Sequence, residues 1–232
     1  MHRERLLRAR PQRYVEVEHA CRRDEYFVRR LEAFGDIVIG FSLALLALSL
    51  IVPNHAATLV RNYAWFAAYV WTFALVCSMW GAHYWTFRYI FVPTAFSLVL
   101  NYAKLGLVVL LIFTVQVLLR AFVTGGARDV IVANELYWGC LVAYWIVAGL
   151  LLFLGMRARA GTLAPELAKP CLLRIWRIAV TAPVVVAAMI VTARGAPEQM
   201  ATTIALCMVG GIVIGSVAGR MATRTPVALQ ST

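Results

Sequence analysis

Three ionisable residues stand out in this sequence, because Asp36, His83 and Lys104 lie within or at the edge of long apolar stretches. An ionisable side chain in such a setting must be paired or hydrated, so it is a candidate for a functional role. The three could brace neighbouring helices as a polar network, or contact a passing ion directly. His83 could also sense protons, because the unperturbed pKa of histidine is about 6.5.

The remaining residues offer little other chemistry. The five cysteines stand singly, with no Cys-x-x-Cys pair and no histidine at metal-ligand spacing, so neither a zinc site nor a disulfide framework is indicated. No Ser-His-Asp set, His-Glu-x-x-His motif, phosphate-binding loop or pair of carboxylates within an apolar stretch occurs. The sequence therefore predicts a protein that is not an enzyme, has no cofactor and takes no small-molecule substrate.

The elements that must position these residues are transmembrane helices. Of the 232 residues 62% are hydrophobic and only 14% are charged, against about 45–50% and about 25% in an average soluble domain. A span needs about 20 largely apolar residues, and the apolar stretches form six blocks at 37–53, 63–83, 97–119, 131–155, 175–193 and 199–219. The fold class is therefore an all-α membrane protein with six transmembrane helices.

Breaks between the blocks carry residues that typically end or interrupt helices. These breaks are Pro53-Asn54-His55, Pro93, Gly125-Gly126-Ala127-Arg128-Asp129, the loop bracketed by Pro165 and Pro170, and Gly195-Ala196-Pro197. The connections are short, so no soluble domain is inserted between spans. Pro183 is expected to kink the fifth span, and the first apolar block has no cleavage signal and should remain in the mature protein.

Most of the 22 Lys and Arg residues fall in alternate connections, which predicts that both termini face the cytoplasm. Residues 1–29 form a basic cytoplasmic arm, residues 30–220 the six-span domain, and residues 221–232 a short cytoplasmic tail. Nucleic acid is not expected as a partner, because acidic residues are interspersed in the arm and a span follows it at once. The lipid bilayer is the expected partner.

The first three blocks carry a recognisable set of motifs. The run that starts at Arg30 contains Phe34 and Asp36, with Gly35 between them, and so matches R-x-x-x-F-S-D except for the serine. The second block ends in Trp80-Gly-Ala-His83, followed by Phe87-Arg88-Tyr89, and a Leu-rich third block continues from Asn101. Over residues 30–122 the sequence thus resembles the bacterial transmembrane protein 175 family of potassium-permeable channels.

The resemblance implies a homotetramer in the bacterial inner membrane, with the four first helices around a central pore and potassium as the permeant ion. Carried over from the family, the pore-lining constriction falls on Phe41, Leu45 and Leu48, whose spacing places them on one helix face. The family usually has Ile at Phe41 and Thr at Ala44. The sequence has no TVGYG-like filter.

The family also implies a polar network that braces the first helix. The matching residues are Arg30, Asp36, Trp80, His83 and Asn101, and Lys104 replaces an apolar residue of the family. At about 100° per residue, Asp36 lies about 140° around the helix from Phe41. If Phe41 lines a pore, Asp36 therefore points toward neighbouring helices, where Lys104 could pair with it or extend toward the interface.

Two other readings remain open from the residues alone. A proton-coupled secondary transporter would use Asp36, His83 and Lys104 as carrier groups and would show broken helices near mid-membrane. A non-conducting scaffold would recruit partners through the basic arm. Independently of these, the sixth block has small residues at a spacing that permits close helix packing, in this subunit or with the next: Gly211, Gly215 and Gly219.

Overall fold

The computed structural model describes residues 12–48, 63–163, 165–192 and 197–223. These residues form six α-helices and no strand, as the sequence predicts. The helices are α2 (Gln12–Leu48), α4 (Tyr63–Tyr89), α5 (Ala95–Thr124), α6 (Ala127–Ala158), α7 (Pro165–Thr192) and α8 (Pro197–Ala222). The predicted break at Pro53-Asn54-His55 and the Gly195-Ala196 part of the last break lie outside the described residues.

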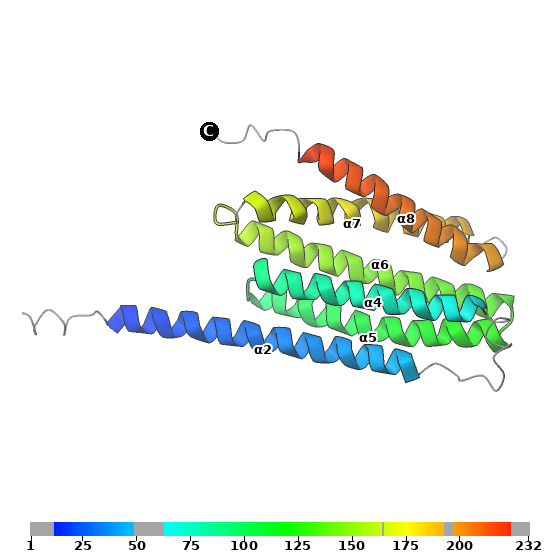
Figure 1. Cartoon of the computed structure of the whole chain (residues 1–232), viewed down its shortest axis with the longest axis horizontal. Coiled ribbons are helices and arrows are strands. Elements are labelled where there is room, and N and C mark those ends of the chain that lie inside the picture. Colours follow the sequence, from blue (N-terminus) through cyan, green and yellow to red (C-terminus); the bar gives the residue numbers. More distant parts are fainter. Residues whose placement is uncertain (1–11, 49–62, 164, 193–196, 224–232) are drawn as a thin grey trace, which may run out of the picture.

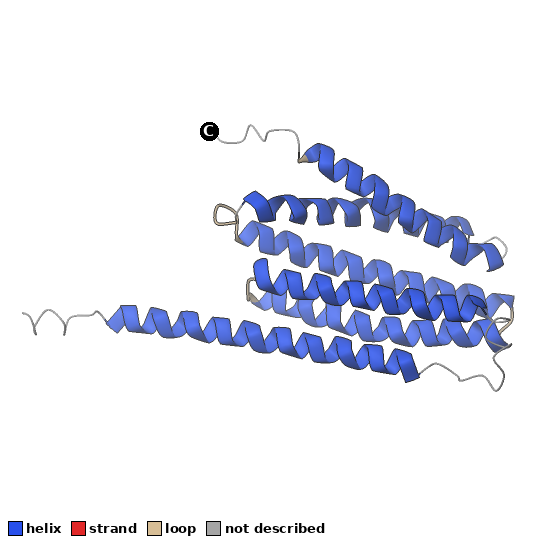
Figure 2. Cartoon of the chain, viewed as in Figure 1, coloured by secondary structure: helices blue, strands red, loops and turns tan. Residues whose placement is uncertain are grey.

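The helices run alternately up and down in one bundle, with α6 between the α4–α5 pair and the α7–α8 pair (Figures 1 and 2). α2 packs against α4 and α5 on one side of the bundle, and α7 and α8 pack closely together on the other. The first half of α2 and the end of α8 lie at the same end of the bundle, which we call the terminal end (Figure 1). An even number of spans produces this arrangement.

Five of the six described helices are long and apolar enough to cross a membrane. α4 is the exception, although its 27 residues are long enough. Trp and Tyr are abundant in α4, and their polar groups lower its hydropathy, whereas the other helices are richer in aliphatic residues. α4 nevertheless lies alongside the others in the bundle (Figure 1).

Two helix ends show why the chain turns where it does. Thr94, which follows Pro93, caps α5: its hydroxyl accepts a hydrogen bond from the Ser97 backbone N–H, and the Ser97 hydroxyl accepts one from the Thr94 backbone N–H. α6 begins directly after Gly126, whose N–H donates to Asp129 Oδ2 at 3.0 Å. The predicted break at residues 125–129 is therefore only a short link, and its last three residues belong to α6.

The predicted loop bracketed by Pro165 and Pro170 is wrong. The turn precedes it, with Gly161 at a φ of 90°, and Pro165 is the first residue of α7. Proline is tolerated there because the first N–H groups of a helix have no partner within it. Pro170 and Pro183 both lie inside α7, where each removes one backbone hydrogen bond.

On the side of the bundle away from α2, α7 and α8 approach each other closely at glycine residues. A Cβ at Gly211 would lie 2.9 Å from Thr181 Cα, and a Cβ at Gly215 would lie 2.8 Å from Arg177 Cα. Gly219 faces Leu173 and Trp176 in the same way. Gly211, Gly215 and Gly219 of α8 thus contact α7 of the same chain.

Candidate pore face and polar cluster of the first helix

α2 has a buried stripe that fixes it to the rest of the chain. The side chains of this stripe recur every three or four residues and pack toward α4 and α5: Leu31, Ile39, Ser42 and Leu46, with Gly35 among them. Ser42 satisfies its hydroxyl by donating to the Val38 carbonyl at 2.8 Å. One face of α2 therefore packs against other helices of its own chain.

A second, apolar stripe of α2 is exposed in the single chain. Phe41 is 68% exposed and Leu48 is 81% exposed, and Leu45 and Ala44 are exposed beside them. Phe34 and Ile37 continue the stripe toward the N-terminus of the helix. Large apolar side chains in such a row must be covered by lipid or by another protein surface. Phe41, Leu45 and Leu48, to which the family resemblance assigns the constriction, all lie here, together with Ala44.

Asp36 lies on the flank between the two stripes and contacts α4. Its Oδ1 accepts a hydrogen bond of 2.9 Å from Trp80 Nε1. The two residues are 44 positions apart in the sequence, so this bond joins α2 to α4 directly. A charge-assisted bond of this kind holds the rotation of α2 about its own axis.

His83 and Lys104 form a second polar contact, deeper in the bundle. His83 is 1% exposed and Lys104 is 3% exposed, and Lys104 Nζ lies 3.0 Å from His83 Nδ1. Which of the two nitrogens donates depends on the tautomer of the imidazole ring. Lys104 Nζ also lies 5.7 Å from the ring centre of Phe87, within range of a cation–π interaction.

Gly35 makes the position of His83 possible. A Cβ atom at Gly35 would overlap His83 Nε2 and Cε1, so any larger residue would displace the imidazole ring. The serine of the family motif would meet the same obstacle. The departure from the motif was visible in the sequence, but its cause was not, because it depends on how closely α2 and α4 approach.

Asn101 shares a face of α5 with Lys104, one turn away, and is fully buried. Neither polar atom of its amide has a hydrogen-bond partner among the described residues, whereas a backbone hydrogen bond with Glu32 acts on the His83 ring. Native proteins rarely leave such groups unpaired. The Asn101 amide therefore has hydrogen-bonding capacity that the described residues do not use.

Arg30 occupies a different place from the other members of the predicted network. It is exposed, and its guanidinium carbon lies 5.5 Å from the ring centre of Tyr26, one turn earlier on α2. The described contacts thus bring together Asp36 with Trp80, and His83 with Lys104, but place Arg30 apart. Sequence reasoning also missed Gln116, whose Nε2 donates to the Leu45 carbonyl at 3.4 Å and ties the far end of α2 to α5.

The described residues contain no group of three or more His, Cys, Asp or Glu side chains that could hold a metal ion. Cys77, Cys140, Cys171 and Cys207 are free thiols. The chemistry of the region is therefore that of a packed polar layer beside an apolar helix face.

Residues 30–111 match the model of a protein family described as the endosomal/lysosomal potassium channel TMEM175. Among solved structures, the fold is similar to a single-residue variant of the potassium channel MtTMEM175 in complex with a nanobody–MBP fusion protein, with a TM-score of 0.62 and 16% identity over 84% of this chain and 94% of that one. It is also similar to a lysosomal potassium-selective channel TMEM175 homolog from Chamaesiphon Minutus, with a TM-score of 0.50 and 21% identity over 86% of this chain and all of that one. Comparison with curated proteins gave no match.

These matches confirm the resemblance that the motifs indicate. The family match covers the second half of α2, all of α4 and just over half of α5, and the fold likeness extends over 84% of the chain. The part that matches in sequence contains both stripes of α2. It also contains the polar cluster, which consists of Asp36, Trp80, His83, Asn101 and Lys104.

Proposed function

We propose that this chain, in which residues 30–111 match the TMEM175 family model, forms a potassium-permeable cation channel and is not an enzyme. In this proposal four copies assemble with their α2 helices around a central pore. The observation that carries it is the exposed apolar stripe of α2, which lies beside the buried stripe that packs on α4 and α5 and within the family match. A membrane helix with one stripe packed in its own chain has the other free to face a pore.

Phe41, Leu45 and Leu48 are the proposed constriction. Their side chains offer no ligand to an ion, so they would control permeation by how easily water fills the space between them. Phe41 is bulkier than the usual residue of the family, and Ala44 supplies no hydroxyl beside it. We expect this narrow, dry constriction to favour a closed state and to select among cations weakly.

The polar cluster would fix the rotation of α2, so that the exposed apolar stripe faces the pore. The Trp80–Asp36 bond fixes the flank of α2, and Lys104 holds the His83 ring against Gly35. Phe41 is about one and a half turns from Asp36, so a change in the rotation of α2 at Asp36 moves Phe41 by a similar angle. Arg30, on the exposed side of α2, would reach a neighbouring copy, and Asn101 would complete the layer.

Both termini are proposed to face the cytoplasm of a bacterium, with the bundle in the inner membrane. Among the described residues, the terminal end of the bundle carries Arg88, Arg157, Lys169 and Arg220 near the ends of four helices, whereas the opposite end carries Arg120 and Arg128. A bias of this kind toward one end places that end in the cytoplasm.

Purified protein in potassium-loaded liposomes tests the proposal. We expect potassium efflux above that of empty vesicles, and an increase of at least severalfold for Phe41→Ala, because truncation widens the constriction. Phe113→Ala is the matched control: Phe113 is also a highly exposed phenylalanine, but it lies on α5 outside the stripe, so efflux should not change.

The absence of flux above empty vesicles for both the wild type and Phe41→Ala, at several pH values, would contradict the channel. Saturable flux that requires a second substrate would favour the proton-coupled transporter instead. A low-resolution image of the purified oligomer checks the assembly separately, because the proposal requires fourfold symmetry with α2 at the axis.

A further inference from the structure

A cavity remote in sequence from α2 has features of a ligand site. It has a volume of about 520 Å³ and is formed by α4, α6 and α7. Most of its wall is apolar, with Leu75 and Met79 from α4 and Leu152 from α6. Two cations, Arg174 and Arg177, line it from α7. Both lie within the segment of α7 that is apolar enough to cross a membrane.

The two arginines use few of their donors. The Arg174 guanidinium carbon lies 4.1 Å from the ring centre of Trp85, a stacking contact that leaves its N–H groups free in the guanidinium plane. Arg177 donates through Nε to Ser216 Oγ at 2.7 Å. Arg174 is affected electrostatically by Cys171 and Arg177, but by no carboxylate among the described residues. Two neighbouring cations in a membrane segment, with no ion-pair partner for Arg174 among the described residues, favour the binding of an anion.

We propose that this cavity binds an anionic phospholipid, with its phosphate on Arg174 and Arg177 and an acyl chain along the apolar wall. Arginine is well suited to phosphate because its planar N–H groups match two phosphate oxygens at once. Basic pockets between transmembrane helices are known to suit anionic head groups. An apolar wall that continues from the cations into the membrane segment fits a lipid better than it fits free phosphate, which has no chain to place there.

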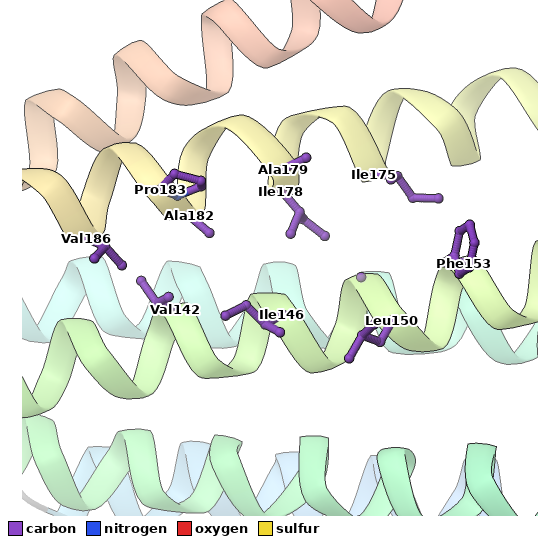
Figure 3. A pocket seen from close by; sticks show the side chains of 11 residues that line it. Val142, Ile146, Leu150, Phe153, Ile175, Ile178, Ala179, Ala182, Pro183 and Val186 are labelled. Carbon is purple, nitrogen blue, oxygen red and sulfur yellow. The ribbon is translucent and has the colours of Figure 1, made fainter.

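A second cavity provides an internal comparison. It lies between α6 and α7, has a volume of about 500 Å³ and meets the first at Ile178. Figure 3 shows its lining, in which Ile146, Leu150 and Phe153 of α6 face Ile175 and Val186 of α7. No charged residue lines it. This second cavity can accept a hydrocarbon chain, but it has nothing to distinguish an anionic head group from a zwitterionic one.

Native mass spectrometry of the purified full chain, incubated with either phosphatidylglycerol or phosphatidylcholine, tests the proposal. We expect the wild type to retain phosphatidylglycerol preferentially, and Arg174→Gln to reduce that preference about tenfold, the effect of losing one charge-assisted contact. Arg157→Gln is the control, because Arg157 is an exposed cation at the same end of the bundle that does not line the cavity. Arg177 is left intact because its bond to Ser216 joins α7 to α8.

A steric variant tests the cavity without changing any charge. Gly81 lines it, and a Cβ added there meets nothing within 4 Å, so Gly81→Leu should fold and place its side chain in the space for lipid. We expect it to lower phosphatidylglycerol retention as Arg174→Gln does. Equal retention of both lipids by the wild type, or no effect of either variant, would overturn the proposal. Displacement of the lipid by inorganic phosphate alone would assign the site to free phosphate instead.

Discussion

At the scale of single residues, two short-range contacts decide how α2 sits on its neighbours. One is the bond from Trp80 to Asp36, and the other is the fit of the His83 ring against Gly35. The motif indicates that these residues belong together, and helix geometry indicates that Asp36 turns away from Phe41. Which atoms meet could not be predicted, because that depends on distances between helices to within a fraction of an ångström.

Asp36→Ala should destabilise the protein by about 1 kcal/mol, because Trp80 loses the acceptor of a partly exposed, charge-assisted hydrogen bond. Trp80→Phe should lower the stability by a similar amount. The double variant should be as stable as the less stable of the two single variants, because both substitutions remove the same bond. Thermal unfolding in detergent and the yield of assembled oligomer measure this. Additive losses in the double variant would show that the two residues do not act through one bond.

Gly35→Ala should destabilise the protein by about 1–3 kcal/mol, since the new methyl group overlaps the His83 imidazole. Gly40→Ala, on the same helix, is the control: a Cβ there meets nothing within 4 Å, so the substitution should be neutral or stabilising through helix propensity. Thermal unfolding compares the two. The cost of Gly35→Ala should shrink when His83 is also alanine, and an unchanged cost would rule out this contact as its source.

At the scale of helices, the apolar blocks predicted correctly where helices occur, but they did not predict where each helix begins and ends. All six blocks lie largely within helices, but α2 begins at Gln12, far before its apolar block, because polar residues continue a helix as readily as apolar ones. Pro165 and Pro170 were assigned to a loop that ends before them, since proline both begins helices and breaks them. Local sequence does not distinguish the two roles.

The packing of α8 on α7 gives a prediction at this scale. Gly215→Ala should lower the unfolding temperature by several degrees, because its methyl group would lie 2.8 Å from Arg177 Cα and push the helices apart. Gly210→Ala is the matched control, as it lies on the same helix with open space around its Cβ. Circular dichroism melts would compare the two variants. Equal unfolding temperatures would show that the close approach contributes nothing to stability.

At the scale of the whole molecule, the sequence predicted the helix count, and the bundle and its likeness to TMEM175 structures followed from motifs in the first three helices. It did not predict the cation-lined cavity, because Arg174 and Arg177 lie at the start of the fifth apolar block, where basic residues commonly flank a span. Only the packing of α4, α6 and α7 shows that they border an apolar space. A site formed between several helices cannot be predicted from the residue pattern of any one of them.

The unbroken length of α2 has a mechanical consequence. Its 37 residues extend for about 55 Å, nearly twice the thickness of the hydrocarbon layer, and no proline interrupts them. A rigid rod cannot be turned at one end without turning at the other. If the part of α2 that projects from the bundle (Figure 1) is rotated, Phe41 and Leu48 rotate with it. The Trp80–Asp36 bond lies between the two parts of the helix and therefore resists this rotation.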